Sequence, residues 1–461
     1  MPDGTESLRR PFLDEPDHIP SDAPQEQGEK RHLAGQDRPL KGAWGITFLI
    51  FLFMLVNFAD KMVIGLAAKP IMEDLGLTPE QFGLIGSAFF FLFPFSAVLV
   101  GFVANRLPAR NALLAMAIFW SVLQFPMLGL VSFEVLIACR ILLGAAEGPA
   151  SPVATHALYK WFPDSLRAVP TAVVAQGSAI GVVVAVPALN WIIVHHSWHW
   201  AFGAIGIAGL LWSVLWFFFG REGTLVDRPV TERVDSETRV PYRDLLTCPT
   251  ILAACCTGFA SYWGLALGLT WFTPYLVDGL GFSQTLGGNL SVLPWIAGLV
   301  VVLAGGWLSQ RLKAGGASSR VSRGILASAA VMVGGCILPF IGFTSAPDLK
   351  LAILIAGTAI GSTIFVAVPL VVSELTPQSQ RAAMLAIVNS IMTLGGVVAP
   401  FAMGVVVQDA ATRLAGYDNG FTILGGLLLA SGLIGVIFIR PEADRRRLAA
   451  LAALRRTSGI P

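Results

Sequence analysis

The chain contains twelve apolar segments of roughly 20 residues, the length that an α-helix needs to cross a bilayer core of about 30 Å. Pro, Gly and charged residues separate the segments. Their extents are 44–68, 79–104, 111–131, 133–157, 168–194, 200–219, 250–276, 285–309, 323–343, 350–373, 382–408 and 420–439. Backbone polar groups find no water in hydrocarbon, so spans of this kind form helices. The sequence therefore predicts an all-α membrane protein with twelve transmembrane helices.

The composition excludes an ordinary soluble domain. Hydrophobic residues make up 55% of the 461 residues, charged residues make up 13%, and the mean hydropathy is +0.70. A net charge of +2 gives no basis for nucleic-acid binding. The five cysteines lie mostly in apolar stretches and predict no disulfide framework.

The basic residues predict the orientation of the spans, because they fall in alternate loops and by the positive-inside rule those loops face the cytoplasm. The opposite loops hold only Lys69, Lys350 and Arg413. The loops rich in basic residues contain Arg106, Arg110, Lys160, Arg167, Arg221, Arg228, Arg233, Arg239, Arg243, Arg311, Lys313, Arg320, Arg323 and Arg381. Both termini are then cytoplasmic. We expect a disordered tail over 1–43 and a basic amphipathic helix over 441–461.

The longest polar interruption divides the spans six and six. It predicts a cytoplasmic linker over 220–248, between a bundle over 44–219 and a second bundle over 249–440. An internal repeat supports this division, because a set of residues in the first half recurs 214 positions later. The set is Pro163, Ser165, Arg167, Ala168, Ala172 and Gly181, repeated as Pro377, Ser379, Arg381, Ala382, Ala386 and Gly395. Two parallel six-helix repeats are typical of a secondary transporter with its site between the halves.

Four ionisable residues, Asp60, Lys61, Arg140 and Glu147, lie inside segments that otherwise carry almost no charge. A charge near the bilayer centre costs about 2.5 to 3.5 kcal/mol, so each needs a partner or a water-filled cavity. Asp60 and Arg140 lie at similar depth in the first and fourth spans, which predicts an ion pair between them. Adjacent residues on a helix point about 100° apart, so Lys61 is left to face the cavity.

These patterns carry a resemblance to the major facilitator superfamily from about residue 44 to residue 440. Within it, the chain most resembles the organic anion symporters related to sialin, the vesicular glutamate carriers, and the bacterial sugar-acid, phthalate and tartrate permeases. The matching patterns are Asn57-Phe58-Ala59-Asp60-Lys61, Ser87-Ala88-Phe89-Phe90, Arg140 with Gly144, Glu147 and Gly148, Trp271-Phe272-Thr273-Pro274-Tyr275-Leu276, Leu293-Pro294-Trp295, and Asn389 with Gly395, Gly396 and Pro400.

The resemblance implies roles for residues beyond the four charges. It places gating residues at the cytoplasmic loops, namely Arg106, Arg110 and Arg311. It places substrate contacts at Lys61, Phe58, Phe93, Gln176, Trp271, Tyr275 and Asn389. The aromatic residues could instead be packing groups, and the two amides could bond only to helix backbones.

The chain departs from the family pattern at both the gate and the site. Asn105 and Gln310 occupy the positions at which the family's cytoplasmic gate has aspartates. The amides cannot form ion pairs, so we expect weaker electrostatic contacts between the halves on the cytoplasmic side. Lys61 replaces an Arg, and Phe58 and Phe93 replace tyrosines. A lysine ammonium is a point charge and cannot form the two parallel hydrogen bonds that an arginine guanidinium makes to a carboxylate. The two phenylalanines lack the hydroxyl groups of tyrosine. We therefore expect a carboxylate substrate with fewer hydroxyls than a sugar acid.

The leading prediction is proton-coupled symport of a small organic anion, such as a monocarboxylate, an aromatic acid or a sugar-acid-like carboxylate. In this hypothesis Lys61 binds the carboxylate, Glu147 carries the proton because desolvation favours its neutral form, and Asp60 switches with Arg140. Purely structural roles for these charges, and snorkelling of Lys61 to the interface, remain alternatives.

Other functions have weaker support in the sequence. Within transport, the alternatives are an anion exchanger, a uniporter and a proton-coupled drug antiporter, the last disfavoured by Lys61. The sequence has no cluster of His, Asp or Glu residues that would indicate an enzyme. It also has no GxxxxGK loop that would indicate ATP-driven transport. We expect no cofactor, no metal and no nucleic-acid partner. We expect a monomer in the inner cell membrane.

Overall fold

The computed structural model describes residues 38–104, 108–129, 131–163, 166–225 and 240–458. The first half of the chain forms α2 (Ala43–Leu66), α3 (Ala68–Leu75), α4 (Pro79–Ala104), α5 (Ala109–Val122), η1 (Phe125–Leu128), α6 (Phe133–Glu147), α7 (Ala150–Tyr159), α8 (Ala168–His195) and α9 (Trp198–Phe219). Residues 1–37 of the predicted tail over 1–43, and residues 226–239 of the predicted linker over 220–248, lie outside the described residues.

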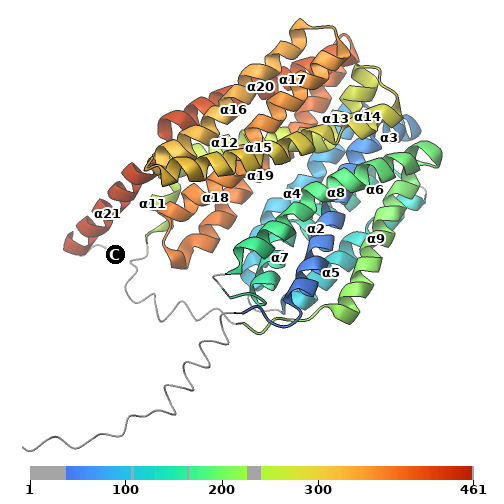
Figure 1. The fold of residues 1–461 in the computed structure, drawn as a ribbon. Coiled ribbons are helices and arrows are strands. Elements are labelled where there is room, and N and C mark those ends of the chain that lie inside the picture. Colours follow the sequence, from blue (N-terminus) through green and yellow to red (C-terminus); the bar gives the residue numbers. More distant parts are fainter. Residues whose placement is uncertain (1–37, 105–107, 130, 164–165, 226–239, 459–461) are drawn as a thin grey trace, which may run out of the picture.

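The second half repeats this helical plan and ends in an additional helix. It contains α11 (Tyr242–Leu246), α12 (Pro249–Thr270), α13 (Phe272–Pro274), η3 (Tyr275–Gly279), α14 (Gln284–Leu290), α15 (Leu293–Ala314), η4 (Arg320–Ile325), α16 (Leu326–Ile337), η5 (Leu338–Phe343), α17 (Pro347–Ile360), η6 (Gly361–Thr363), α18 (Ile364–Leu375), η7 (Gln378–Gln380), α19 (Arg381–Asp409), α20 (Arg413–Phe438) and α21 (Pro441–Ser458). Figure 1 shows the two helical halves side by side.

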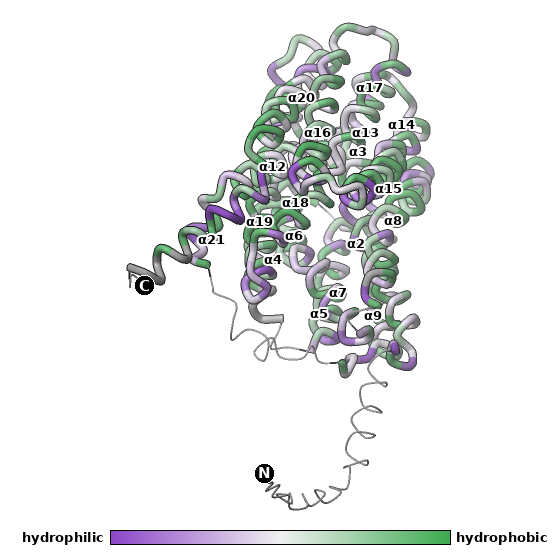
Figure 2. The backbone as a smooth tube through the Cα atoms, turned by 60° about the vertical axis from the view of Figure 1, so that its left-hand side comes forward, coloured by the Kyte–Doolittle hydropathy of each residue, from purple (hydrophilic) through white to green (hydrophobic). Residues whose placement is uncertain are grey.

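The fold class is as predicted, with one difference in the fourth span. Within the described residues, 11 helical runs are long and apolar enough to cross a membrane. The predicted span 133–157 is instead two shorter helices, α6 and α7, separated at Gly148 and Pro149. Proline has no backbone N–H and interrupts the ladder of helical hydrogen bonds, which explains the break. Many large apolar residues along the spans are exposed, and Figure 2 shows that the long helices consist largely of hydrophobic residues.

The halves are joined at the end of the molecule that carries α3, α13 and α14, which we call the closed end. The Gln284 amide donates to the Leu66 carbonyl at 2.9 Å, and the Asn190 amide donates to the Thr285 carbonyl at 3.0 Å. An ion pair of 3.4 Å joins Lys69 to Asp278. Burial raises the pKa of Asp278, an effect that Lys69 partly opposes.

At the opposite end, which carries the last turns of α9 and α20, the described residues form no comparable set of contacts between the halves. Ser390 on α19 donates to the Pro94 carbonyl on α4 at 3.1 Å, past the middle of α4. Between residues that the structure describes, no hydrogen bond or ion pair joins the halves nearer this open end. We call this end, at which α2 begins, the open end, because the described hydrogen bonds and ion pairs between the halves lie elsewhere.

Glycines allow the backbones of α4 and α6 to approach closely. A Cβ atom at Gly144 would lie 1.7 Å from the Phe89 carbonyl oxygen, and one at Gly148 would lie 2.3 Å from that of Phe93. Small residues at such positions are how membrane helices gain contact area. The two glycines thus fix the side chains on α6 against α4.

We expect Gly144→Ala to lower the midpoint of thermal unfolding in detergent, because the added methyl group forces α6 away from α4. Overpacking of this kind costs about 1–3 kcal/mol. Gly426→Ala on α20 is the matched control, because no atom lies within 4 Å of its added Cβ. It should be neutral or slightly stabilising. Equal effects of the two substitutions on the unfolding midpoint would contradict the close-approach argument.

Candidate functional site

The four charges predicted from the sequence gather in the first half, on α2 and α6. All are buried, with exposed fractions of 1% for Asp60, 7% for Lys61, 4% for Arg140 and 1% for Glu147. Asp60 and Lys61 lie in the last two turns of α2, and Glu147 ends α6 just before the break at Gly148. The structure therefore brings all four residues into one region.

Lys61 and Glu147 form a buried ion pair between α2 and α6. The Lys61 ammonium donates to Glu147 Oε2 and to the side-chain oxygen of Asn57, one turn earlier on α2. It also lies over the rings of Phe58 and Phe89, at 4.9 and 5.7 Å from their centroids. Lys61 thus points toward α6 and does not snorkel to an interface.

Asp60 faces a different helix from Lys61, as expected from the 100° offset of adjacent residues. Its partner is Gln124 in the turn between α5 and η1, whose amide nitrogen donates to both carboxylate oxygens at 2.9 Å. The described residues contain no Asp60–Arg140 ion pair within 4.0 Å, and two of the Arg140 nitrogens have no hydrogen-bond partner there. The Arg140 guanidinium instead lies 4.7 Å from the centroid of the Phe89 ring.

Gln124 was missed in the sequence analysis. It is buried, with 2% exposed, and it was identifiable as an amide inside the apolar segment 111–131. An amide can donate its N–H groups to an ionised carboxylate, or turn over and accept from a protonated one. Gln124 can therefore form a hydrogen bond with Asp60 whether the carboxyl group is ionised or protonated.

Several polar atoms of this cluster have no hydrogen-bond partner within the described protein. They are buried nitrogen or oxygen atoms of Asn57 (Nδ2), Arg140 (Nε and Nη1) and Glu147 (Oε1). Burying a polar atom without a partner costs about 1–3 kcal/mol. Three donor atoms and one acceptor atom of this region are thus left without a partner in this conformation.

An aromatic layer lies between the charges and the second half. Phe58 meets Trp295 of α15 edge to face, with ring centroids 6.3 Å apart. Phe93 packs against Phe89 and Phe90, with centroids 5.6 and 6.0 Å away. The predicted contacts Phe58 and Phe93 therefore lie next to the charge cluster.

Beyond Trp295, a cavity of about 400 Å³ lies between α8 and the second half. Its walls come mainly from α12, α15, α17, α18 and α20, and they include Gln176, Ser261, Phe272, Trp295 and Phe365. No lining residue is charged. The hydroxyl oxygen of Ser261 is buried and has no partner in the described protein. The cavity is thus an apolar space with a few hydroxyl and amide groups.

Three of the predicted substrate contacts lie elsewhere. Trp271 is fully buried and its indole N–H donates to the Pro400 carbonyl at 2.9 Å. The Tyr275 hydroxyl donates to Asp418 at 2.9 Å. Asn389 is exposed on α19 and does not line the cavity. In this conformation the structure does not bring these three residues to the charges or to the cavity.

Two of the predicted gating residues, Arg110 and Arg311, lie at the open end. Arg110 donates to the carbonyls of Gly220 and Phe217 at 2.7 and 2.8 Å, which ties α5 to the end of α9. Although burial raises it, the pKa of Glu222 is held below its usual value by hydrogen bonds from Lys160 and from backbone N–H groups that include that of Arg110. Arg311 lies 5.2 Å from the Trp307 ring. Arg106 lies outside the described residues.

Comparisons with known proteins agree with this architecture. The family model described as Major Facilitator Superfamily matches residues 50–400. The chain is 29% identical over 414 residues to a hexuronate transporter of Bacillus subtilis (strain 168), covering 86% of this chain and 95% of the relative. It is 26% identical over 403 residues to a D-galactonate transporter of Escherichia coli O6:H1, covering 82% and 93%.

Solved structures of similar fold include an inward-facing, unoccupied bacterial homologue of the human lysosomal transporter Spinster. Its TM-score is 0.73 at 16% identity, and the match covers 87% of this chain and 98% of the other. A D-xylose-proton symporter matches with a TM-score of 0.70 at 16% identity, covering 87% and 99%. At this identity the two structures support the fold alone.

The Asp60–Gln124 contact can be tested by a double-mutant cycle on thermal stability in detergent. Gln124→Leu should destabilise the protein by about 1–3 kcal/mol, because it removes the donors to a buried carboxylate. In an Asp60→Asn background the same substitution should cost less, because no charge is left unpaired. Additive effects of the two substitutions would show that the contact does not stabilise the carboxylate.

Proposed function

The chain belongs to the Major Facilitator Superfamily, and from this premise we propose that it carries a small organic anion across a cell membrane together with protons. It is a multi-pass transporter and not an enzyme. The proposal places it as a monomer in the inner cell membrane with both termini, and hence the open end, in the cytoplasm. The basic loops of the sequence support that orientation.

The observation that carries the proposal is the buried ion pair between Lys61 and Glu147. A carboxylate substrate and the Glu147 carboxylate compete for the same ammonium group. When Glu147 takes up a proton, Lys61 loses its counter-charge and becomes free to bind the substrate carboxylate. When the proton leaves, Glu147 reclaims Lys61 and displaces the substrate. In this scheme one proton accompanies each carboxylate.

Asp60 and Arg140 form the second part of the proposed coupling site. Asp60 lies within electrostatic range of Glu147, Arg140 and Lys61, so a proton on either carboxylate changes the charge felt by the other. Gln124 can donate to ionised Asp60 and accept from protonated Asp60. Arg140, with its two unpartnered nitrogens, would switch between Asp60 and the incoming anion.

The substrate proposed is a monocarboxylate, an aromatic acid or a sugar-acid-like carboxylate. The relatives named above carry hexuronate and D-galactonate, which supports a carboxylate group. The uncharged cavity beside Trp295 would take the remainder of the molecule. Five of the 24 lining residues carry a hydroxyl group, but those of Ser291, Thr358 and Ser362 already donate to backbone carbonyls. Phe58 and Phe93 add no hydroxyl group, so an acid with a partly apolar body fits the site better than a fully hydroxylated one.

The proton role is tested by Glu147→Gln in proteoliposomes. The variant should lose accumulation of substrate in response to an imposed pH difference, because Gln cannot release a proton. Lys61 then stays free, so exchange of labelled for unlabelled substrate should continue. Undiminished pH-driven accumulation would rule out Glu147 as the proton carrier. Exchange without any response to pH in the wild-type protein would indicate an anion exchanger or a uniporter.

The substrate role is tested with a panel of carboxylates on wild-type protein, Lys61→Gln and Lys61→Arg. A charged hydrogen bond contributes about 1.5–3 kcal/mol, so Lys61→Gln should raise the apparent KM on the order of tenfold or more. Lys61→Arg should retain most binding. Lys41→Gln, an exposed residue before α2, is the matched control. Uptake of no acid, with binding of lipophilic cations, would favour the drug-antiporter alternative.

A further inference from the structure

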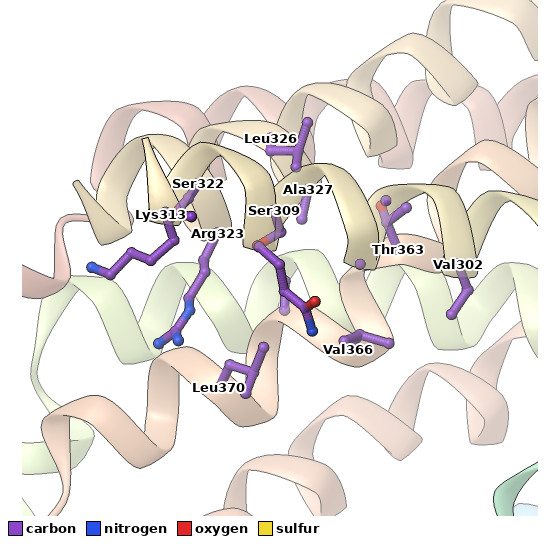
Figure 3. Close-up of a pocket in the computed structure, with 15 residues that line it drawn as sticks. Val302, Ser309, Lys313, Ser322, Arg323, Leu326, Ala327, Thr363, Val366 and Leu370 are labelled. Atoms are coloured by element: carbon purple, nitrogen blue, oxygen red, sulfur yellow. The ribbon is translucent and has the colours of Figure 1, made fainter. Parts of the chain in front are cut away.

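A second cavity, of about 390 Å³, lies within the second half near the open end. Figure 3 shows it between α15, the segment from η4 to α16, and α18. It shares Val302 and Val366 with the cavity beside Trp295, but none of the four charged residues of the candidate site lines it. We propose that this cavity binds an anionic phospholipid of the surrounding leaflet, with the phosphate at its charged end and the start of an acyl chain along its apolar wall.

The cavity exists because α15 has little side-chain volume where it faces α18. Gly305 and Gly306 both line it. A Cβ at Gly305 would lie 2.9 Å from the Thr363 methyl group, so the helices are close at this level. At Gly306 no atom lies within 4 Å of the added Cβ. The space therefore opens from Gly306 toward the end of α15.

The charged end of the cavity is cationic. Of its fifteen lining residues, Lys313 and Arg323 are basic and none is acidic. Figure 3 shows both side-chain heads at the same end of the cavity. Lys313 donates to the Ser319 hydroxyl at 2.9 Å, and within the described residues no carboxylate lies within 4.0 Å of its ammonium group. This end suits a single anionic group.

Arg323 is held in place by Glu374, which lies 3.0 Å from one of its nitrogens. The side chain is still 26% exposed, and a guanidinium has five N–H donors, so others remain for a phosphate. The Glu374 carboxylate is outside the cavity lining. Arg323 can thus contact Glu374 and an anion at once.

The rest of the wall is apolar and lies along the membrane-spanning part of the helices. Val302, Leu326 and Val366 lie away from the Lys313 end, and Leu370 lies near the Arg323 side chain (Figure 3). Val366 and Leu370 are 40% and 41% exposed, although they are large apolar residues. No residue of α15 within Leu293–Ala314 is buried. An amphipathic ligand would cover these surfaces.

Free phosphate would use only the cationic end and would leave the apolar wall uncovered. A phospholipid would place its phosphate at the cationic end and an acyl chain along the apolar wall. Its headgroup would then lie at the level where the spanning helix α15 ends. Basic pockets between membrane helices hold anionic headgroups by this combination. Each lysine or arginine near a charged membrane surface contributes about 1 kcal/mol, or about a fivefold change in binding.

The test measures lipid binding to the purified full-length protein by native mass spectrometry after removal of endogenous lipid. Phosphatidylglycerol should bind with preference over phosphatidylcholine. Lys313→Gln should weaken phosphatidylglycerol binding by about fivefold. Arg311→Gln is the matched control, because this arginine is exposed on the same helix and does not line the cavity. It should retain wild-type binding.

Further variants separate the parts of the proposal. Leu370→Gln should weaken binding of the lipid without changing any charge. Arg323→Lys should bind more tightly than Arg323→Gln, and the thermal midpoint of each variant reports whether loss of the Glu374 partner has unfolded it. Equal losses for Lys313→Gln and Arg311→Gln would overturn the proposal. So would displacement of the lipid by equimolar inorganic phosphate, or equal binding of phosphatidylcholine.

Discussion

The buried ion pair between Lys61 and Glu147 is the interaction on which the candidate site depends. Two charges removed from water cost several kcal/mol each, and their attraction repays that cost only when the geometry is good. Here Asn57 adds a second oxygen to the ammonium group, and two phenylalanine rings face it. A pair so balanced contributes little to stability and is sensitive to a proton or to a competing carboxylate.

The helices around this pair are closely packed, and this packing fixes the positions of the charged side chains. Gly144 and Gly148 hold α6 against α4 with almost no space between backbones, which fixes the height of Glu147. Gln124 holds Asp60 from the turn after α5. The first half therefore carries its charges on helices that cannot easily slide past one another. The clasp at the closed end joins this half to the second near Lys69 and Asn190.

Much of the fold followed from the sequence, because span length and charge are local properties. Apolar length predicted the helices, and the scarcity of membrane charges singled out Lys61 and Glu147. Residue counting gave depth along a helix but not the direction that each side chain faces across the bundle. The sequence analysis therefore paired Asp60 with Arg140, whereas in the structure Asp60 accepts hydrogen bonds from Gln124. Trp271 and Tyr275 were assigned by resemblance, and only tertiary packing reveals their burial.

The uncharged wall of the cavity beside Trp295 has a consequence for how this protein can change. All four membrane charges of the cluster lie on α2 and α6, whereas most of the cavity lining lies in the other half. Substitutions at Ser261, Phe272 or Phe365 would reshape the cavity without altering a single charge. Selection for a new substrate can thus act on one half while the other half conserves the energetics, so related chains can diverge in what they carry before they diverge in how they carry it.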